Sequence, residues 1–380
     1  MKKLFLPLLL LVTIVTQAQV PNTISAADKV YGLSKFWQEV NYNFVYLDKV
    51  DRTKWDKAYR EAITKVQETK DDYEYYRELQ RFCAMLNDGH TNIYYPEGIN
   101  ALLHTDMFGK YRLFLTNIDN KAIVTRTNLS IKDEVPVGSE IIEVNGLPTA
   151  KYLEQEVLPF ISSSTDYVLM DMAVETMLEG LEGSRYEIKY RTPKGKVKGL
   201  TLTHAKTTEQ EVYPAFEKRE LLDLKWYPNQ TAYLALNGFG NKKINELFLQ
   251  KLPELRNAKA LIIDLRYNGG GSTNIGRQIL DYLTPDTLLY GSKNATRLHL
   301  ASFKAWGVFT EPKDTVNNAW ATKSLMAYQD RLMHAFDYNP VKNMVQPKDK
   351  VIVPTAILIG HGTASAAEDF LIYADNQKHM

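Results

Sequence analysis

The stretch LIIDLRYNGGG at residues 261–271 decides the fold class of this 380-residue chain. Its first five residues are apolar except for Asp264, which is typical of a strand buried in a parallel sheet. Three glycines end the stretch, and Ile275 and Ile279 then recur at helical spacing. A strand, a glycine-rich turn and a helix in this order predict an α/β unit, in which ligands bind at the carboxyl end of the strand.

The same order returns near the end of the chain. Ile352–Ile359 predicts a second buried strand, Gly360–Ala364 predicts a turn, and a helix is expected to begin near Ser365. Tyr233–Leu236 predicts a shorter third strand. Strands that alternate with helices imply a mostly parallel sheet, so the region 207–380 is interpreted as an α/β core.

Two further segments precede this core. Residues 24–100 carry three apolar stripes at helical spacing, which predict a helical segment. Residues 105–205 hold β-prone runs around turns such as Asp119-Asn120 and Pro193-Lys194-Gly195, which predict a small β-rich domain. Residues 285–350 mix aromatic and charged side chains without a pattern that assigns them.

The first 18 residues differ from the rest of the chain. Lys2 and Lys3 precede an almost wholly apolar run, Leu4–Val15, and small residues around Ala18 suit a signal peptidase. The run is too short to cross about 30 Å of hydrocarbon as a stable anchor. We therefore expect a signal peptide over 1–18 and a bacterial-type exported protein, periplasmic or secreted. An uncleaved anchor is the alternative.

Composition narrows the function class. The chain has 46 basic and 45 acidic side chains, and removal of Lys2 and Lys3 would leave 44 against 45. Such a balance gives no basic excess for nucleic acid or anionic lipid. No later stretch has the length and apolarity of a membrane span, so none is expected in the mature chain. Cys83 is the single cysteine, which excludes an internal disulfide and favours a core thiol over a catalytic one.

Ser365 is the first candidate catalytic residue. At a strand-to-helix junction, unpaired N–H groups and the helix dipole favour negative charge. The oxyanion of a tetrahedral intermediate would be stabilised there, and the N–H of Ala366 is a suitable donor. The small neighbours Ala364 and Ala367 would let a substrate backbone come close. From this local pattern, Ser365 is equally well read as a nucleophile or as an ordinary helix N-cap.

The glycine run is the second candidate. Consecutive glycines permit positive φ and a close backbone approach, which suits a second oxyanion donor, for which the N–H of Gly270 is preferred. A plain strand-to-helix turn is the alternative. Asp264 and Arg266 are interpreted as partners of each other rather than as catalytic groups.

A serine nucleophile needs a base. His90 follows the turn residues Asn87-Asp88-Gly89 and precedes the β-prone run Thr91–Tyr95. A lone histidine in such a place is more often structural. His361 lies in the same turn as Ser365 and is expected to point elsewhere. No histidine pair has metal-ligand spacing, so neither a metal nor a cofactor is expected.

Together these motifs resemble peptidase family S41, the tail-specific serine peptidases with their C-terminal processing and tricorn-like branches. The resemblance covers nearly the whole chain after the leader. It rests on LNDGHT at 86–91, GSEIIEVNG at 138–146, DLRYNGGG at 264–271 and TASAAED at 363–369. It implies a multidomain α/β protein: a crotonase/ClpP-like catalytic core over 207–380, preceded by a helical N-terminal segment (24–100) and a β-rich PDZ-like domain (105–205).

The resemblance also implies roles for single residues. Ser365 matches the nucleophile, His90 the base of the tricorn-like branch, and Ala366 and, to within one residue, Gly270 match the oxyanion donors. The implied substrate is a polypeptide, whose free C-terminus the PDZ-like segment would capture by adding a strand at a sheet edge.

The chain departs from the family after the nucleophile. In the processing branch, a lysine about two dozen residues after the serine is the base. In the tricorn-like branch, a later glutamate orients the histidine. Here only 15 residues follow Ser365, and Lys378 is too close to it to match that lysine. We therefore expect a fragment of a longer protein, an orienting group from elsewhere, or a weakened enzyme. A non-catalytic peptide-binding protein with the same fold is the alternative function. A serine esterase of the α/β-hydrolase type is disfavoured, because no G-x-S-x-G surrounds Ser365.

Overall fold

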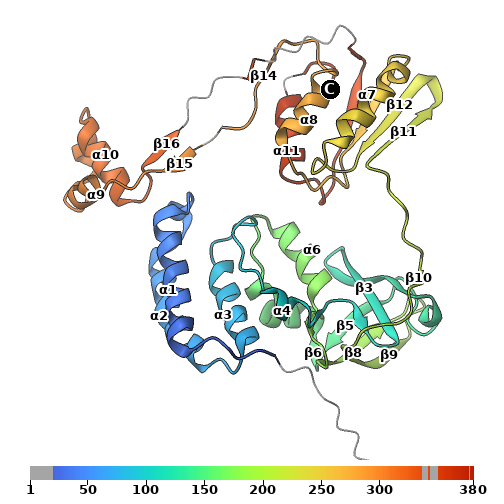
Figure 1. Ribbon diagram of the computed structural model, residues 1–380, viewed down its shortest axis with the longest axis horizontal. Helices are drawn as coiled ribbons and strands as arrows, with labels where there is room; N and C mark the ends of the chain where they lie inside the picture. Colours follow the sequence, from blue (N-terminus) through green and yellow to red (C-terminus); the bar gives the residue numbers. More distant parts are fainter. Residues whose placement is uncertain (1–19, 294, 336–340, 343–349, 376) are drawn as a thin grey trace, which may run out of the picture. The chain divides into compact units, whose positions relative to one another are not determined.

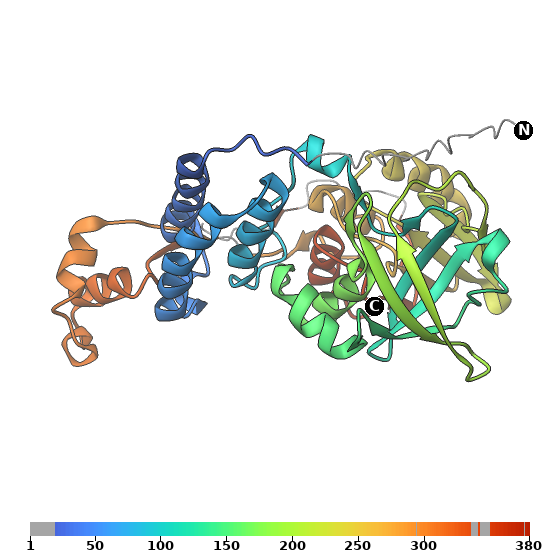
Figure 2. The same cartoon turned by 90° about the horizontal axis from the view of Figure 1, so that it is seen from below.

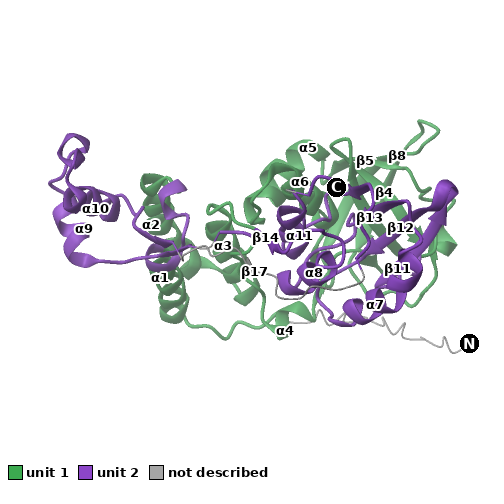
Figure 3. Ribbon diagram, turned by 90° about the horizontal axis from the view of Figure 1, so that it is seen from above, with its two compact units in different colours: residues 1–40, 50–216 green, residues 41–49, 217–380 purple. Residues whose placement is uncertain are grey.

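The computed structural model describes residues 20–293, 295–335, 341–342, 350–375 and 377–380 (Figure 1). The expected signal peptide lies outside these residues. The chain divides into two compact units: unit 1 holds residues up to 40 and 50–216, and unit 2 holds 41–49 and 217–380 (Figure 3). In the part that is described, no helix combines the length and apolarity needed to cross a membrane.

Helices open unit 1, as the apolar stripes predict. They are α1 (Ala26–Asn43), whose last three residues count with unit 2, α2 (Arg52–Glu68), α3 (Asp72–Ala84) and the short α4 (Glu97–Asn100). The Trp55 ring stacks on Phe82, with centroids 3.9 Å apart. Cys83 lies beside them, fully buried, and burial raises the pKa of its thiol. Its interpretation as a core thiol is confirmed.

Residues 91–95 do not form the strand that their β-prone composition suggests. The Gln80 side chain on α3 donates to the Ile93 carbonyl oxygen (3.1 Å) and accepts from the Tyr95 hydroxyl (3.0 Å). A helix side chain thus supplies the partners that a neighbouring strand would otherwise provide.

The β-rich part of unit 1 is an antiparallel sheet in the order β2-β3-β4-β5-β8-β9. Asp119 and Asn120, with φ of 51° and 60°, close the predicted hairpin between β3 and β4. The predicted hairpin of β8 and β9 is also present, and α6 packs on β3. The bounds are β1 (Leu103–His104), β2 (Met107–Phe108), β3 (Tyr111–Ile118), β4 (Lys121–Asn128), β5 (Glu140–Val144), β6 (Leu147–Pro148), α5 (Thr149–Tyr152), α6 (Asp166–Thr176), β7 (Gly180–Leu181), β8 (Arg185–Arg191), β9 (Val197–Thr203) and β10 (Val212–Tyr213).

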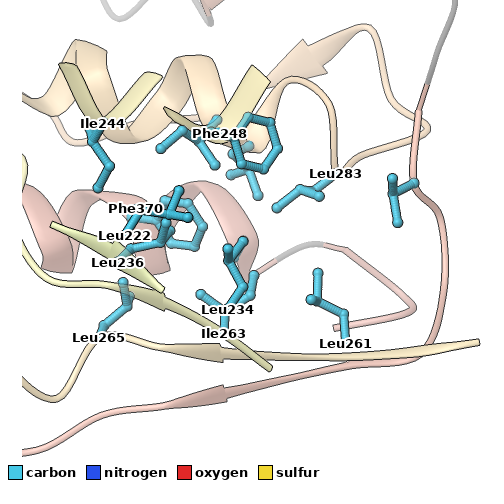
Figure 4. Close-up of a cluster of buried hydrophobic side chains, with 14 of the residues drawn as sticks. Leu222, Leu234, Leu236, Ile244, Phe248, Leu261, Ile263, Leu265, Leu283 and Phe370 are labelled. Atoms are coloured by element: carbon cyan, nitrogen blue, oxygen red, sulfur yellow. The ribbon is translucent and has the colours of Figure 1, made fainter. Parts of the chain in front are cut away.

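Unit 2 is built on a four-stranded sheet in the order β11-β12-β13-β18, in which β12, β13 and β18 run parallel. Three helices, α7, α8 and α11, lie over one face of this sheet, and apolar side chains fill the space between them (Figure 4). The bounds are β11 (Leu222–Tyr227), β12 (Thr231–Leu236), α7 (Lys243–Leu255), β13 (Ala260–Asp264), α8 (Thr273–Leu280), β18 (Thr355–Leu358) and α11 (Ala366–Ala374). These elements confirm the predicted α/β class.

The burial expected for the last strand is wrong. β18 is shorter than the predicted run 352–359, and it pairs with β13 alone among the described strands. Ile352, Leu358 and Ile359 are 42%, 36% and 59% exposed. An apolar run predicts a strand, but its burial depends on neighbours that the run itself does not specify.

The unassigned region also contains regular structure. α9 (Ala301–Gly307) and α10 (Ala319–Tyr328) lie side by side, drawn in orange in Figures 1 and 2. The pairs β15 (Ala295–Arg297) with β16 (Met333–Ala335), and β14 (Leu288–Leu289) with β17 (Val341–Lys342), precede and follow them.

Candidate active site

Ser365 is held in a strained conformation at the junction of β18 and α11. Its φ of 55° and ψ of −118° lie in a region that a non-glycine residue adopts at a cost of about 1–3 kcal/mol. The Glu368 carboxylate accepts the Ser365 N–H at 2.7 Å and thereby fixes this backbone. Such strain is concentrated at functional sites, and a sharp strand-to-helix turn is a known way to present a nucleophilic serine.

Gly270 lies directly against Ser365. Its φ is 95°, and a Cβ added to it would stand 2.6 Å from the Ala364 oxygen, 2.7 Å from the Ser365 Cβ and 2.9 Å from the Ala366 nitrogen. Real Cβ atoms do not approach so closely, so a glycine is required here. Three residues singled out from the sequence, Ser365, Gly270 and Ala366, are therefore brought together within unit 2.

Asn268 organises the glycine turn. Its side-chain oxygen accepts the Gly270 N–H at 3.0 Å, and its side-chain nitrogen donates to the Leu236 oxygen at 2.9 Å. Its main-chain oxygen accepts the Ala364 N–H at 3.0 Å. The N–H expected to stabilise an oxyanion is thus bound to Asn268 in this conformation. The N–H of Ala366 lies in the first turn of α11, where helical N–H groups have no partner within the helix.

Asp264 and Arg266 form the ion pair that the sequence suggests. The Arg266 guanidinium donates to both Asp264 carboxylate oxygens, with contacts of 2.7–3.1 Å, and the Tyr233 hydroxyl donates to the same carboxylate. Burial alone would raise the pKa of Asp264, but these hydrogen bonds outweigh it and lower the pKa to about 2. The ion pair fixes the strand end from which the glycine turn departs.

Asp264→Asn is expected to flatten the acid dependence of stability. Because the folded pKa is depressed, the carboxylate stabilises the fold above its unfolded pKa of about 3.9, and the contribution is lost as the pH falls towards 2. The parent should therefore lose roughly 1 kcal/mol more unfolding free energy than the variant between pH 5 and pH 3. Urea unfolding at both pH values measures it.

Asp223→Asn is the matched control, because Asp223 pairs with Lys225 on the surface at 2.9 Å. Exposed ion pairs contribute little, so this variant should follow the parent at both pH values. An Asp264→Asn variant whose acid dependence equals the parent's would contradict the assigned role of the carboxylate.

His90 belongs to unit 1 and is exposed in a tightly held turn. The Asp88 carboxylate accepts the Thr91 hydroxyl at 2.5 Å, and the Ser164 hydroxyl accepts the Gly89 N–H at 2.9 Å. The His90 main-chain N–H lies 3.5 Å from the Asp88 carboxylate. Asp88 thus stabilises the turn that carries the imidazole, as aspartates in turns often do.

The sequence does not predict two residues of the site, Asn268 and Glu368. In the sequence, Asn268 only begins the glycine run, and Glu368 is only part of the motif after Ser365. Both act by accepting backbone N–H groups. The available signal was weak: asparagine before glycine indicates a turn, and a glutamate three residues after a serine matches a capping pattern.

Residues 230–379 match the model of peptidase family S41. Carboxyl-terminal-processing peptidase 2, chloroplastic, from Arabidopsis thaliana is 26% identical over 271 residues, which are 65% of this chain and 48% of that protein. The chain thus spans about half the length of this curated relative.

Solved structures show a similar fold. Mature CPAF complexed with lactacystin has a TM-score of 0.61 and 13% sequence identity, and the match covers 93% of this chain and 83% of that chain. Mature CPAF alone has a TM-score of 0.58 at the same identity, with 93% and 82% covered. At this identity the likeness concerns the fold alone.

Proposed function

Because residues 230–379 form a segment of peptidase family S41, we propose that this chain is a serine peptidase with Ser365 as its nucleophile. The observation that carries the proposal is the strained Ser365 at the start of α11, with Gly270 and Ala366 packed against it. A hydroxyl held at a helix N-terminus, beside a backbone without side chains, suits acyl transfer to a peptide carbonyl.

In the proposed reaction, the Ser365 hydroxyl attacks the scissile carbonyl carbon while His90 takes its proton. The oxyanion that forms accepts a hydrogen bond from the Ala366 N–H. The Gly270 N–H leaves the Asn268 side-chain oxygen and donates a second hydrogen bond to the oxyanion. His90 then protonates the departing amine, the carbon–nitrogen bond breaks, and water hydrolyses the acyl ester on Ser365.

The proposed substrates are exported polypeptides cleaved near their C-termini. Support comes from the predicted leader over 1–18, from the antiparallel sheet of unit 1, and from the processing peptidase among the relatives. The resemblance to a PDZ-like domain implies a carboxylate-binding loop before its first strand, near residues 107–109. There the Gly109 N–H donates to the Ala205 oxygen at 2.9 Å. Capture of a C-terminus would therefore use sheet-edge groups or require this bond to open.

A peptide-binding protein without catalysis is the second candidate. It is favoured by one contact, the hydrogen bond from the Gly270 N–H to Asn268, which occupies a proposed oxyanion donor. Such a protein would bind polypeptides and leave them intact.

His90→Ala is expected to lower casein cleavage at least about a hundredfold, because a positioned base contributes about 10²- to 10⁴-fold in rate. His361→Ala is the matched control, since His361 is exposed in the turn before Ser365 but has no part in the mechanism. Release of acid-soluble peptides measures both rates.

The outcomes separate the candidates. Loss of activity in His361→Ala with retention in His90→Ala would show that the base assignment is wrong. A parent that binds casein without cleaving it would favour the peptide-binding candidate.

A further inference from the structure

Unit 1 contains a cavity of about 390 Å³ that the proposed mechanism does not use. It lies among α3, residues 92–94, the segment 152–162, α6 and β8. Tyr152 and Met177 are buried in its floor, whereas Tyr94 and Met172 at its rim are 78% and 38% exposed. Its volume falls in the range of small-molecule pockets, about 300–1,000 Å³.

One wall of the cavity carries a cation without an ionic partner. The Arg77 guanidinium carbon lies 3.4 Å from the centroid of the Phe160 ring. Neighbouring carboxylates on α3 are engaged elsewhere, since Glu74 pairs with Lys70 at 3.1 Å and Glu78 with Arg81 at 3.6 Å. Within the part of the chain that the structure describes, Arg77 forms no ion pair. The guanidinium also interacts with the Tyr95 hydroxyl. Because arginine has five N–H donors, others remain for a planar carboxylate.

The cavity also holds a carboxylate that forms no ion pair. Glu179 accepts the Thr105 hydroxyl at 3.3 Å, and none of the ion pairs among the described residues includes it. Burial raises the pKa of its carboxyl, and the hydrogen bond from Thr105 and the attraction of Arg77 offset this only in part. An ammonium group in the cavity would compensate that cost.

The remaining walls combine aromatic, apolar and polar groups. Tyr73, Tyr152, Tyr186 and Phe160 contribute rings, and Met172, Met177 and Val157 contribute aliphatic surface. Polar side chains, among them a second carboxylate, Glu156, also line the cavity. Rings beside fixed polar groups suit a small ligand that has both apolar and polar parts.

We propose that this cavity binds a small zwitterion of the amino-acid or short-peptide class. The ligand carboxylate contacts Arg77, its ammonium group contacts Glu179, and its apolar side chain packs on the rings. The inference goes beyond the proposed peptidase reaction and does not depend on it, because a free amino acid has no peptide bond to cleave.

Calorimetric titration of the purified full chain with three probes tests the proposal. L-phenylalanine carries both charges, N-acetyl-L-phenylalanine lacks the ammonium group, and L-phenylalaninamide lacks the carboxylate. We expect L-phenylalanine to bind, and each other probe to bind at least about tenfold more weakly, because each loses one of the two charge contacts. No detectable binding of L-phenylalanine up to about 10 mM would overturn the proposal. Equal binding of the acetylated probe would overturn the zwitterion proposal. It would indicate instead that the cavity binds the carboxyl end of a polypeptide.

Paired variants locate the binding. Arg77→Gln should weaken L-phenylalanine at least about tenfold and remove its advantage over the amide. Arg81→Gln is the matched control, because Arg81 lies over the same Phe160 ring, 4.3 Å from its centroid, and does not line the cavity. Equal effects of the two substitutions would overturn the assignment. Thermal unfolding checks that each variant folds. If Arg77→Gln does not fold, the three-probe series on the parent protein tests the proposal by itself.

Discussion

Ser365→Ala is expected to lower the rate of casein cleavage by about 10⁴-fold or more, since no other hydroxyl would occupy the start of α11. Its thermal unfolding midpoint should fall only slightly. Alanine retains the bond from the Ser365 main-chain N–H to Glu368 and loses only the side-chain half of the capping box, worth about 1 kcal/mol. A loss of rate far larger than this loss of stability would therefore identify the hydroxyl as a reacting group.

Ser272→Ala is the matched control for this substitution. Ser272 also precedes a helix, α8, and forms no side-chain cap bond. Its replacement should leave cleavage near the parental rate. If Ser365→Ala retained activity within about tenfold of the parent, the nucleophile would have to be sought elsewhere, since covalent catalysis does not survive loss of its nucleophile.

Gly270→Ala is expected to have the largest combined effect on stability and activity. The added Cβ would stand 2.6–2.9 Å from atoms of Ala364, Ser365 and Ala366, at a φ of 95° that alanine disfavours. Relief requires the two turns to move apart, which should cost about 3 kcal/mol of unfolding free energy. Because the displaced atoms are those proposed to react, cleavage should fall about a thousandfold.

Gly269→Ala provides the comparison, because a Cβ at Gly269 would meet no atom within 4 Å. Urea unfolding and casein cleavage of the two variants are measured side by side. Comparable losses in both would mean that the glycine run matters for chain flexibility rather than for the contact with Ser365.

The sequence predicted those parts of the fold that depend on local chemistry. The apolar run Leu261–Leu265 predicts β13, because a strand buried on both faces is almost continuously apolar. The pair Asp119-Asn120 predicts a hairpin, because both residues tolerate positive φ. Ser365 and Gly270 were found because a serine and a glycine run each followed a predicted strand.

The strands that the sequence does not predict depend on partners elsewhere in the chain. The strand β11 was missed although Leu222, Leu224 and Trp226 alternate along it, because a short alternation is ambiguous until its partner β12 is known. The strands β15 and β16 pair across a helical insertion that no local pattern reveals. Asn268 and Glu368 are different, because the backbone N–H groups that they accept, those of Gly270 and Ser365, lie in the same turns. Their local patterns, an asparagine before glycine and a glutamate three residues after a serine, are common in turns and helix starts and do not single out a site.

The hydrogen bonds between the two turns have a consequence for the order of folding. The Thr363 hydroxyl donates to the Leu265 oxygen across 98 residues of chain, and the Ala364 N–H donates to the Asn268 oxygen across a similar span. Contacts of such separation pay loop-closure entropy and form late. A chain still emerging or partly unfolded therefore holds Ser365 as an ordinary, unstrained alcohol. The reactivity proposed for Ser365 would then arise only after β13 and β18 have paired, so that a chain that is not yet folded would not cleave other polypeptides.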